Sequence, residues 1–353
     1  MTIIRGFLQI RVTSKLQYAY DSTPTKTSCT LPTFQGREYP RPTMWAVDLQ
    51  VMLVVGLLVM LQVQQSLQLR SSHPMHGVVD KINENAGPYI GLVMTFPTEE
   101  LALIDSAFFF PSSEIPWVDL AGRRFNIGNI KGADVIYVNA VITVQILLDT
   151  FDIIGIVYYG IAGSSNDSLY IGDVSVPNYV AYTGSWTWKE FRSAEENIIE
   201  LKFGNFNFPE KGENLLAMID FTPQQLYSIV KPMEEDVKLQ QCVNETYCLP
   251  ETPKVVYGLR GSSADIYLDN AAYREFLFKA FNVSTVDEES AAIVMTCLSN
   301  GVPCIVFRGV SDYVGGEGLL SSTSLTYLAA VNALSVAIEF IGLFGEEAAI
   351  HDH

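Results

Sequence analysis

The chain has 353 residues, 48% of them hydrophobic and 17% charged, which is enough apolar material for one large core or two smaller domains. Its formal net charge of −17 makes it repel phosphate backbones, which argues against a nucleic-acid-binding role. Five cysteines are too few for a disulfide scaffold, and no spacing among them matches a zinc site.

The first 70 residues are expected to precede the domain. Residues 1–43 are rich in Thr, Pro, Arg and Ser without a sustained period, which favours disorder or an extension that arises from gene prediction. Residues 44–70 hold the apolar run Val51–Leu61, which is shorter than the roughly 20 residues of a membrane span but suits a secretory signal that begins at Met44. We therefore expect passage through the secretory pathway to a vacuole or the exterior; the alternative is a single-pass membrane anchor.

Residues 79–344 are predicted to form one domain of alternating strands and helices, followed by a tail at 345–353. Strands are expected at 89–94, 124–130, 134–138, 153–159, 172–180, 254–258 and 303–310, and helices from 98 onward and at 271–281, 286–299 and 322–343. Thr98 is expected to cap the first helix, and Pro177 to mark an edge strand or an irregularity. The all-apolar strand at 153–159 is typical of a sheet covered on both faces. The alternation predicts an α/β fold.

Three carboxylates stand where an α/β sheet gathers its ligands. Glu99 follows the first strand, Glu289 starts an apolar helix, and Asp312 comes just past the last core strand in the pair Ser311-Asp312. Carboxyl ends of parallel strands meet at one mouth of the sheet, so the three acids are expected around one ligand. Two acids that face one ligand can divide the work of breaking a glycosidic bond. Taken alone, each acid is explained as well by helix or turn capping.

Two segments carry a family resemblance: GLRGSSADIYLDNAAYREFL and EESAAIVMTCLSNGVPCIVFRGVSD. They resemble the nucleoside phosphorylase and nucleosidase superfamily, and within it the plant bark storage and vegetative storage protein branch. The resemblance covers most of residues 88–343. It implies a single three-layer α/β domain with a central mixed, largely parallel sheet, no metal or organic cofactor, and self-association as a dimer or trimer.

The resemblance also implies a function, which is cleavage of the N-glycosidic bond of a purine nucleoside or its 5′-thio analogue. Two alternatives stay open: a nitrogen-storage glycoprotein with little or no catalysis, and a nucleoside-binding protein without turnover. Asp312 would protonate the departing base, Glu289 would hold the ribose hydroxyls, and Glu99 would activate water. The remaining implied positions are Phe96 beside the ribose, Tyr267 and Leu268 against the base, and a glycine-rich loop of Gly160, Ile161, Ala162 and Gly163 beneath sugar and base.

The chain departs from the family pattern at several places. Ile161 stands where hydrolases of the family often carry a hydroxyl, and Glu288 replaces a methionine. The stretches 138–146 and 227–241 look shortened, which puts activity in doubt. Phosphorolysis needs an arginine-based anion clamp, and the nearby arginines, Arg123, Arg124 and Arg308, form no convincing set, so water is favoured over phosphate as the nucleophile.

Three sequons favour glycosylation if the chain enters the secretory pathway: Asn166-Asp-Ser, Asn244-Glu-Thr and Asn282-Val-Ser. Cys242 and Cys248 bracket the loop CVNETYC, and they are candidates for a local disulfide in an oxidising compartment and for free thiols in a reducing one.

The other chemistry-bearing side chains have plainer interpretations. Cys297 and Cys304 are expected to be small core residues. All four histidines fall outside the predicted core, which argues against a Ser-His-Asp or Cys-His site: His73, His76, His351 and His353.

Overall fold

The computed structural model describes residues 73–139, 143–184, 218–220, 237–315 and 323–351. These residues belong to one compact unit, Gln68–His353. The extension predicted at 1–43 and the signal-like segment at 44–70 lie outside the described residues, as do residues 140–142 and 227–236 of the stretches that look shortened.

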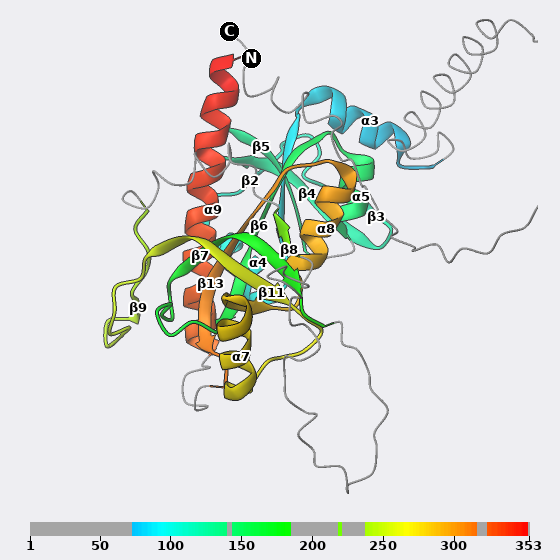
Figure 1. The fold of residues 1–353 in the computed structure, drawn as a ribbon. Helices are drawn as coiled ribbons and strands as arrows, with labels where there is room; N and C mark the ends of the chain where they lie inside the picture. Colours follow the sequence, from blue (N-terminus) through cyan, green and yellow to red (C-terminus); the bar gives the residue numbers. More distant parts are fainter. Residues whose placement is uncertain (1–72, 140–142, 185–217, 221–236, 316–322, 352–353) are drawn as a thin grey trace, which may run out of the picture. The chain divides into compact units, whose positions relative to one another are not determined.

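One large mixed sheet organises the described chain (Figure 1). Its strands are β1 Tyr89–Met94, β2 Phe110–Pro111, β3 Trp117–Leu120, β4 Arg123–Ile130, β5 Ala133–Asn139, β6 Ile153–Ser164, β7 Val174–Tyr182, β8 Met218–Asp220, β11 Val255–Ser263, β12 Val283–Asp287 and β13 Cys304–Tyr313. They are ordered β12-β11-β7-β13-β6-β1-β5-β4-β2, with β3 paired to β4 and β8 to β7. A separate small hairpin joins β9 Cys242–Asn244 to β10 Tyr247–Cys248.

The heart of the sheet is parallel, and part of it closes on itself. Strands β5, β1, β6 and β13 run parallel to one another, as do β7, β11 and β12. β12 pairs with β11 on one side and, antiparallel, with the end of β6 on the other. In register, Gly163 of β6 therefore lies between Val286 of β12 and Asp312 of β13. This closure brings the ends of three strands to one place.

Helices cover both faces of the sheet. They are α3 His76–Asn85, α4 Pro97–Ser106, α5 Thr143–Thr150, α7 Ala271–Phe281, α8 Ser290–Asn300 and α9 Thr323–His351. One core cluster joins α4 and α9 to one face, and a second joins α3, α5 and α8 to the other, which gives three layers (Figure 1). Consecutive residues of β6 enter opposite clusters: Val157 and Tyr159 face α9, whereas Ile156 and Tyr158 face α8. The strand is apolar throughout because both of its faces are covered.

Helix α9 is the longest apolar element of the described chain. Its stretch Leu325–Phe344 has the length and hydropathy of a membrane span, yet 67% of that stretch is buried inside the fold. Side chains such as Ala333, Ala337 and Ile341 pack into the cluster above the sheet. The burial identifies this stretch as a core helix, whose apolar surface packs against the sheet.

The predicted fold class is confirmed, and several element boundaries are corrected. Strand 89–94 and helix 271–281 match β1 and α7 residue for residue, and the hairpin signal at Lys131-Gly132 joins β4 to β5. Helix 286–299 was placed too early, because residues 283–287 form strand β12 and α8 begins only at Ser290.

The structure corrects three further predictions and decides a fourth. Thr98 does not cap α4, since Phe96 is the N-cap residue and Pro97 opens the helix. Of the two alternatives for Pro177, the irregularity is confirmed, because the register of β7 against β11 shifts at this residue; the edge is not, because β7 lies between β11 and β13. The segment 160–163 is not a loop but the continuation of β6, and Asp312 lies inside β13 rather than beyond it.

Candidate active site

A cleft opens where β6, β12 and β13 end together. It holds about 520 Å³ of empty space, part of it open to solvent. The residues that line it come from five parts of the chain: Phe96; Ile161, Ala162 and Gly163; Ile266, Tyr267 and Leu268; Val286, Asp287, Glu288 and Glu289; and Ser311, Asp312 and Val314. The cleft therefore collects most of the residues that the family resemblance implies, with the exceptions of Glu99 and Gly160.

Arg308 is the organising residue beneath the cleft. Its side chain is 1% exposed, and its Nε donates to Asp287 Oδ2 at 2.9 Å and to Ser290 Oγ at 3.0 Å. Its Nη2 donates to Tyr158 OH at 2.6 Å and to Glu289 Oε2 at 3.1 Å. Burial by itself disfavours the charged guanidinium, but the surrounding carboxylates, Asp287 foremost, outweigh it and raise the pKa of Arg308. The cation is therefore permanent, and it fastens the carboxylates in place.

Glu289 lies at the start of α8, and two buried side chains hold its carboxylate. Tyr158 OH and Arg308 Nη2 both donate to Glu289 Oε2, at 3.2 Å and 3.1 Å. Burial raises the pKa of Glu289, and Arg308 opposes the shift. One carboxylate oxygen is thus occupied by the protein, and the residue lines the cleft, as a group that accepts hydroxyl hydrogens from a sugar must.

Asp312 lies on β13 at the far side of the cleft. Ser311 Oγ donates to Asp312 Oδ1 at 2.6 Å, and burial nonetheless raises the pKa of Asp312. A carboxyl whose pKa is raised keeps its proton to higher pH, which suits a general acid. The negative charge of Asp312 is the main cause that raises the pKa of the Tyr267 hydroxyl, and both side chains line the cleft.

Glu99 lies close to this cluster but not in the cleft. Its side chain is 0% exposed, and Glu99 Oε2 accepts from the backbone N–H groups of Thr95 at 2.8 Å and Phe96 at 3.0 Å. Its Oε1 accepts from the backbone N–H of Ile161 at 2.9 Å and lies 4.0 Å from Arg308 Nη1. The three predicted acids therefore converge, with Glu99 behind the wall that faces the ligand space.

The four residues of the predicted loop have distinct positions on β6. A Cβ on Gly160 would overlap Arg308 Nη1 and the Glu99 carboxylate, so only glycine fits there. Ile161, Ala162 and Gly163 line the cleft. Gly163 is the point at which β12 and β13 meet β6.

The residues expected beside the ribose and the base lie at the rim. Phe96 is 42% exposed and Tyr267 is 73% exposed, and both line the cleft together with the half-buried Leu268. Glu288 is exposed, so its charge is solvated rather than buried against the ligand space. Of the three nearby arginines, Arg123 and Arg124 lie exposed on β4, and Arg124 pairs with Asp119.

Asp287 is a functional neighbour that sequence analysis missed. Its Oδ1 accepts from Ser263 Oγ at 2.6 Å and from the backbone N–H groups of Glu289 and Ser290 at 3.1 Å and 2.9 Å. Its Oδ2 accepts from Ser290 Oγ at 2.6 Å and from Arg308 Nε. Asp287 thereby holds the start of α8 and aims Glu289. Tyr158 and the central role of Arg308 were also missed, although an arginine in the otherwise apolar run CIVFRGV is a visible signal, since a buried cation requires acidic partners.

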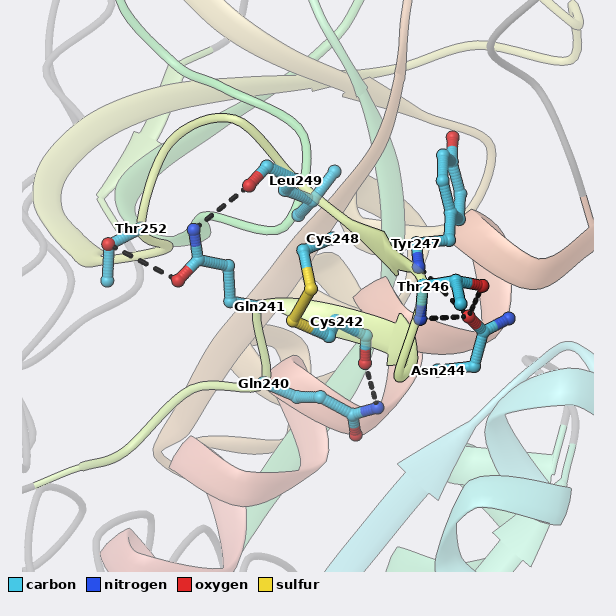
Figure 2. The surroundings of a disulfide bond; sticks show 9 residues. All are labelled: Gln240, Gln241, Cys242, Asn244, Thr246, Tyr247, Cys248, Leu249 and Thr252. Atoms are coloured by element: carbon cyan, nitrogen blue, oxygen red, sulfur yellow. Dashed lines mark hydrogen bonds between the residues drawn. A yellow bond between two sulfur atoms is a disulfide. The ribbon is translucent and has the colours of Figure 1, made fainter.

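The sequons and the cysteine pair lie away from the cleft. Cys242 and Cys248 form a disulfide that closes the hairpin β9–β10, and Asn244 lies exposed at its tip (Figure 2). Asn282 is exposed and ends α7 in the left-handed conformation, and Asn166 is half-buried. Cys297 and Cys304 are free and buried. In the part of the chain that the structure describes, no cluster of three His, Cys, Asp or Glu side chains is arranged to hold a metal ion.

Comparisons with known proteins fit this geometry. The model of the phosphorylase superfamily matches residues 89–341. Bark storage protein A of Populus deltoides is 38% identical over 305 residues, which span 79% of this chain and 96% of that protein. The 5′-methylthioadenosine/S-adenosylhomocysteine nucleosidase of Halalkalibacterium halodurans is 23% identical over 234 residues, or 64% of this chain and 88% of that protein.

Solved structures with the same fold include a 5′-methylthioadenosine/S-adenosylhomocysteine nucleosidase of Colwellia psychrerythraea in complex with adenine. It has a TM-score of 0.54 and 21% identity, and covers 72% of this chain and 95% of its own. The futalosine hydrolase of Helicobacter pylori has a TM-score of 0.52 and 18% identity, with 73% and 97% covered. At these identities the likeness is one of fold.

Proposed function

The chain belongs to the phosphorylase superfamily, as its sequence predicts, and from this premise we propose that it binds a purine nucleoside or a 5′-thio analogue and cleaves the N-glycosidic bond with water. The observation that carries the proposal is that Asp312 and Glu289 line one cleft. The two carboxyl groups have different surroundings, because Glu289 is tied to a cation and Asp312 is not. Such a pair can divide acid and charge-stabilising roles.

Asp312 acts as the general acid in this proposal. Burial raises its pKa, so the carboxyl retains a proton that it can donate to the purine ring as the bond to the sugar breaks. The electrons of the C1′–N bond pass to the base, and the proton prevents a full negative charge on the leaving group. Tyr267 and Leu268, at the same rim, offer apolar and aromatic surface to the flat face of the base.

Glu289 binds the ribose and favours the positive charge that develops on the sugar. Its Oε2 is held by Tyr158 and Arg308, so the carboxylate need not reorganise when the charge appears. Phe96 covers the sugar from the opposite wall. Glu99, anchored by three backbone N–H groups, accepts a proton from the attacking water.

Water is preferred to phosphate for an electrostatic reason. Among the residues that the structure describes, Arg308 is the arginine at the site, and it is already bonded to Asp287 and Glu289, with Glu99 4.0 Å away. A phosphate dianion would enter a cluster in which carboxylates outnumber the guanidinium, and repulsion opposes its binding. Addition of phosphate is accordingly expected to leave the rate of base release unchanged.

The test measures, by chromatography, the release of free purine from adenosine and 5′-methylthioadenosine. Asp312→Asn should lower kcat by roughly 10²- to 10⁴-fold, the usual contribution of a general acid. Asp265→Asn is the matched control, because Asp265 is an exposed aspartate on the neighbouring segment that does not line the cleft. Equal base release by wild type and Asp312→Asn would refute catalysis by this site.

A second function is supported by the storage-protein relative, which matches over 96% of its length at 38% identity. We propose that the chain passes through the secretory pathway and accumulates as a nitrogen store, with or without catalysis. The disulfide between Cys242 and Cys248 supports an oxidising compartment. Protein abundance through a growth cycle tests this: accumulation followed by decline during regrowth is expected, and constant trace abundance contradicts it.

Self-association is also part of the proposal. Large apolar side chains remain exposed along α4 and just after it, among them Leu101, Ile104 and Phe108, close in sequence to Phe96 of the cleft. A dimer or trimer that covers this surface would remove apolar area from water. Sedimentation equilibrium of the full chain tests it, and a mass of one chain at micromolar concentration would contradict it.

A further inference from the structure

Glu99 and the ligand space are separated by an apolar wall. Glu99 is 0% exposed and does not line the cleft, whereas Ile161 and Phe96 do. The same two residues donate their backbone N–H groups to the Glu99 carboxylate, at 2.9 Å and 3.0 Å. Glu99, the general base of the proposed reaction, is therefore hydrogen-bonded to the backbone of two residues that line the ligand space.

Behind this wall lies a polar atom that lacks a partner. Arg308 Nη1 is buried and makes no hydrogen bond within the described residues, although the rest of the guanidinium is fully bonded. It lies 4.0 Å from Glu99 Oε1, and both atoms border Gly160, where any Cβ would overlap them. One water molecule at ordinary hydrogen-bond distance, about 2.8 to 3.0 Å, can bridge a donor and an acceptor this far apart. The spacing of Glu99 Oε1 and Arg308 Nη1 thus suits one bridging water molecule.

We propose that Ile161 controls how this water reaches the sugar, so that the chain binds its nucleoside well but turns it over slowly. The inference rests on the proposed hydrolysis. In that step the water oxygen forms a bond to C1′, the C1′–N bond breaks, Glu99 takes a proton from the water, and Asp312 gives one to the base. The isoleucine side chain is stiff because it is branched at Cβ and sits in a strand, and its partly buried face packs against the core under α9. It covers the path without offering a hydrogen bond to the water.

The experiment shortens Ile161 and separates binding from turnover. In Ile161→Ala, kcat for purine release should rise by at least about tenfold. The reason is that Glu99, the general base, is no longer shielded and regains part of the contribution typical of acid–base groups. KM and the calorimetric affinity for adenosine should change by less than about threefold, because Ile161 is one of fourteen residues that line the cleft. Ile161→Val removes one methyl group and should raise kcat in the same direction by less, and it serves if the alanine variant folds poorly.

Two controls decide what a gain means. Glu99→Gln in the Ile161→Ala background should abolish the gain, which a merely looser cleft would not do. Ile266→Ala shortens another isoleucine of the cleft lining, one to which the proposed reaction gives no role, and it should not raise kcat. Unchanged kcat in an Ile161 variant that still binds adenosine would overturn this inference alone. Absence of nucleoside binding by the wild type would overturn the proposed function and the inference with it.

A second inference comes independently from the hairpin β9–β10. Asn244 Oδ1 accepts from Thr246 Oγ1 and from the backbone N–H groups of Thr246 and Tyr247, each at 2.9 Å. Figure 2 shows the Nδ2 of Asn244 pointing away from these partners, at the tip of the loop that the disulfide closes. The Asn166 side chain is the opposite case, because it is half-buried and its Nδ2 donates to Ser284 Oγ at 3.2 Å.

We infer that Asn244 carries an N-linked glycan and that Asn166 does not. In the transfer, Asn244 Nδ2 loses a proton and bonds to the anomeric carbon of an oligosaccharide, whose bond to a lipid diphosphate breaks. The disulfide and the glycan are products of the same oxidising compartment, so the inference rests on the proposed secretory passage. A glycan at Asn244 costs the fold no hydrogen bond, whereas one at Asn166 would break its contact with Ser284.

The full chain, expressed in plant cells, provides the test by peptide mass spectrometry before and after enzymatic deglycosylation. The peptide with Asn244 should carry one glycan, Asn244→Gln should remove that mass, and Asn166→Gln should leave it unchanged. A bare peptide at Asn244 in a chain whose signal has been removed would overturn the inference. A cytosolic chain that keeps its first 70 residues would overturn the secretory proposal on which it rests.

Discussion

The two walls of the cleft offer a ligand very different chemistry. On the wall built by β12, α8 and β13, the carboxyl groups of Glu289 and Asp312 reach the ligand space. On the wall built by β6 and the start of α4, Ile161 and Phe96 face the ligand and the carboxylate of Glu99 lies behind them. Three acids at comparable places in the chain thus have unequal access to the same hollow. The comparison teaches that a set of acidic residues predicts a site, but burial decides which of them can act on a ligand.

Arg308 links the two walls, so its removal should have the largest effect. Arg308→Met leaves the carboxylates of Asp287 and Glu289 buried without their cation, and loss of one partner of a buried ion pair costs about 3–5 kcal/mol. We expect the free energy of unfolding in urea to fall by that amount. Arg124→Met, which breaks an exposed pair with Asp119, is the control and should leave the free energy of unfolding almost unchanged, because solvent screens that pair. Equal effects of the two substitutions would contradict the central role of Arg308.

Gly160 tests how tightly the residues behind the apolar wall of the cleft are packed. The added methyl group of Gly160→Ala would overlap Arg308 Nη1 and the Glu99 carboxylate, and overpacking of a filled interior costs about 1–3 kcal/mol. Thermal unfolding should move to lower temperature. Gly122→Ala serves as a comparison for steric contact, since a Cβ there meets nothing within 4 Å, although its positive φ of 73° adds backbone strain. A Gly160→Ala protein with wild-type stability and unchanged base release would show that the space beneath Ile161 is loose.

The pH dependence of base release tests Asp312, which lies on the wall of the cleft that presents carboxyl groups to the ligand. Its pKa is raised by burial from 3.8, so the active, protonated form persists to higher pH and is lost as the pH rises through the raised pKa. Above that point kcat/KM should fall about tenfold per pH unit. The sign for stability is the same, because a carboxyl with a raised folded-state pKa stabilises the fold at low pH and loses that contribution as the pH rises. In Asp312→Asn this part of the pH dependence of unfolding should disappear; its persistence would assign it to another group.

Glu288 should have the smallest effect. It lines the cleft but is exposed, so solvent screens its charge. Glu288→Gln is expected to lower KM by less than about threefold and to leave kcat unchanged. A much larger gain in affinity, measured by calorimetry with adenosine, would mean that this carboxylate points at the ligand rather than into water.

Much of the fold followed from local patterns. The all-apolar run of β6 predicts a strand covered on both faces, and Val157 and Ile156 do enter opposite cores. Boundaries failed where tertiary pairing extended a strand beyond its apolar run. Gly160–Gly163 reads as a turn in isolation but continues β6 because β13 pairs with it throughout. Val286 reads as helical but pairs with Gly163 in β12.

What the sequence by itself determined is the α/β class, the family and the set of acids, because these depend on periodicity and on motifs that are continuous in the chain. What only the tertiary structure decided is access. Asp287, Tyr158 and Arg308 come from three different strands, and their hydrogen bonds arise only when β12 closes against β6. Glu99 is fully buried, whereas Ile161, whose backbone is bonded to it from some sixty positions away, lines the ligand space; exposure is a property of packed surfaces rather than of residue order.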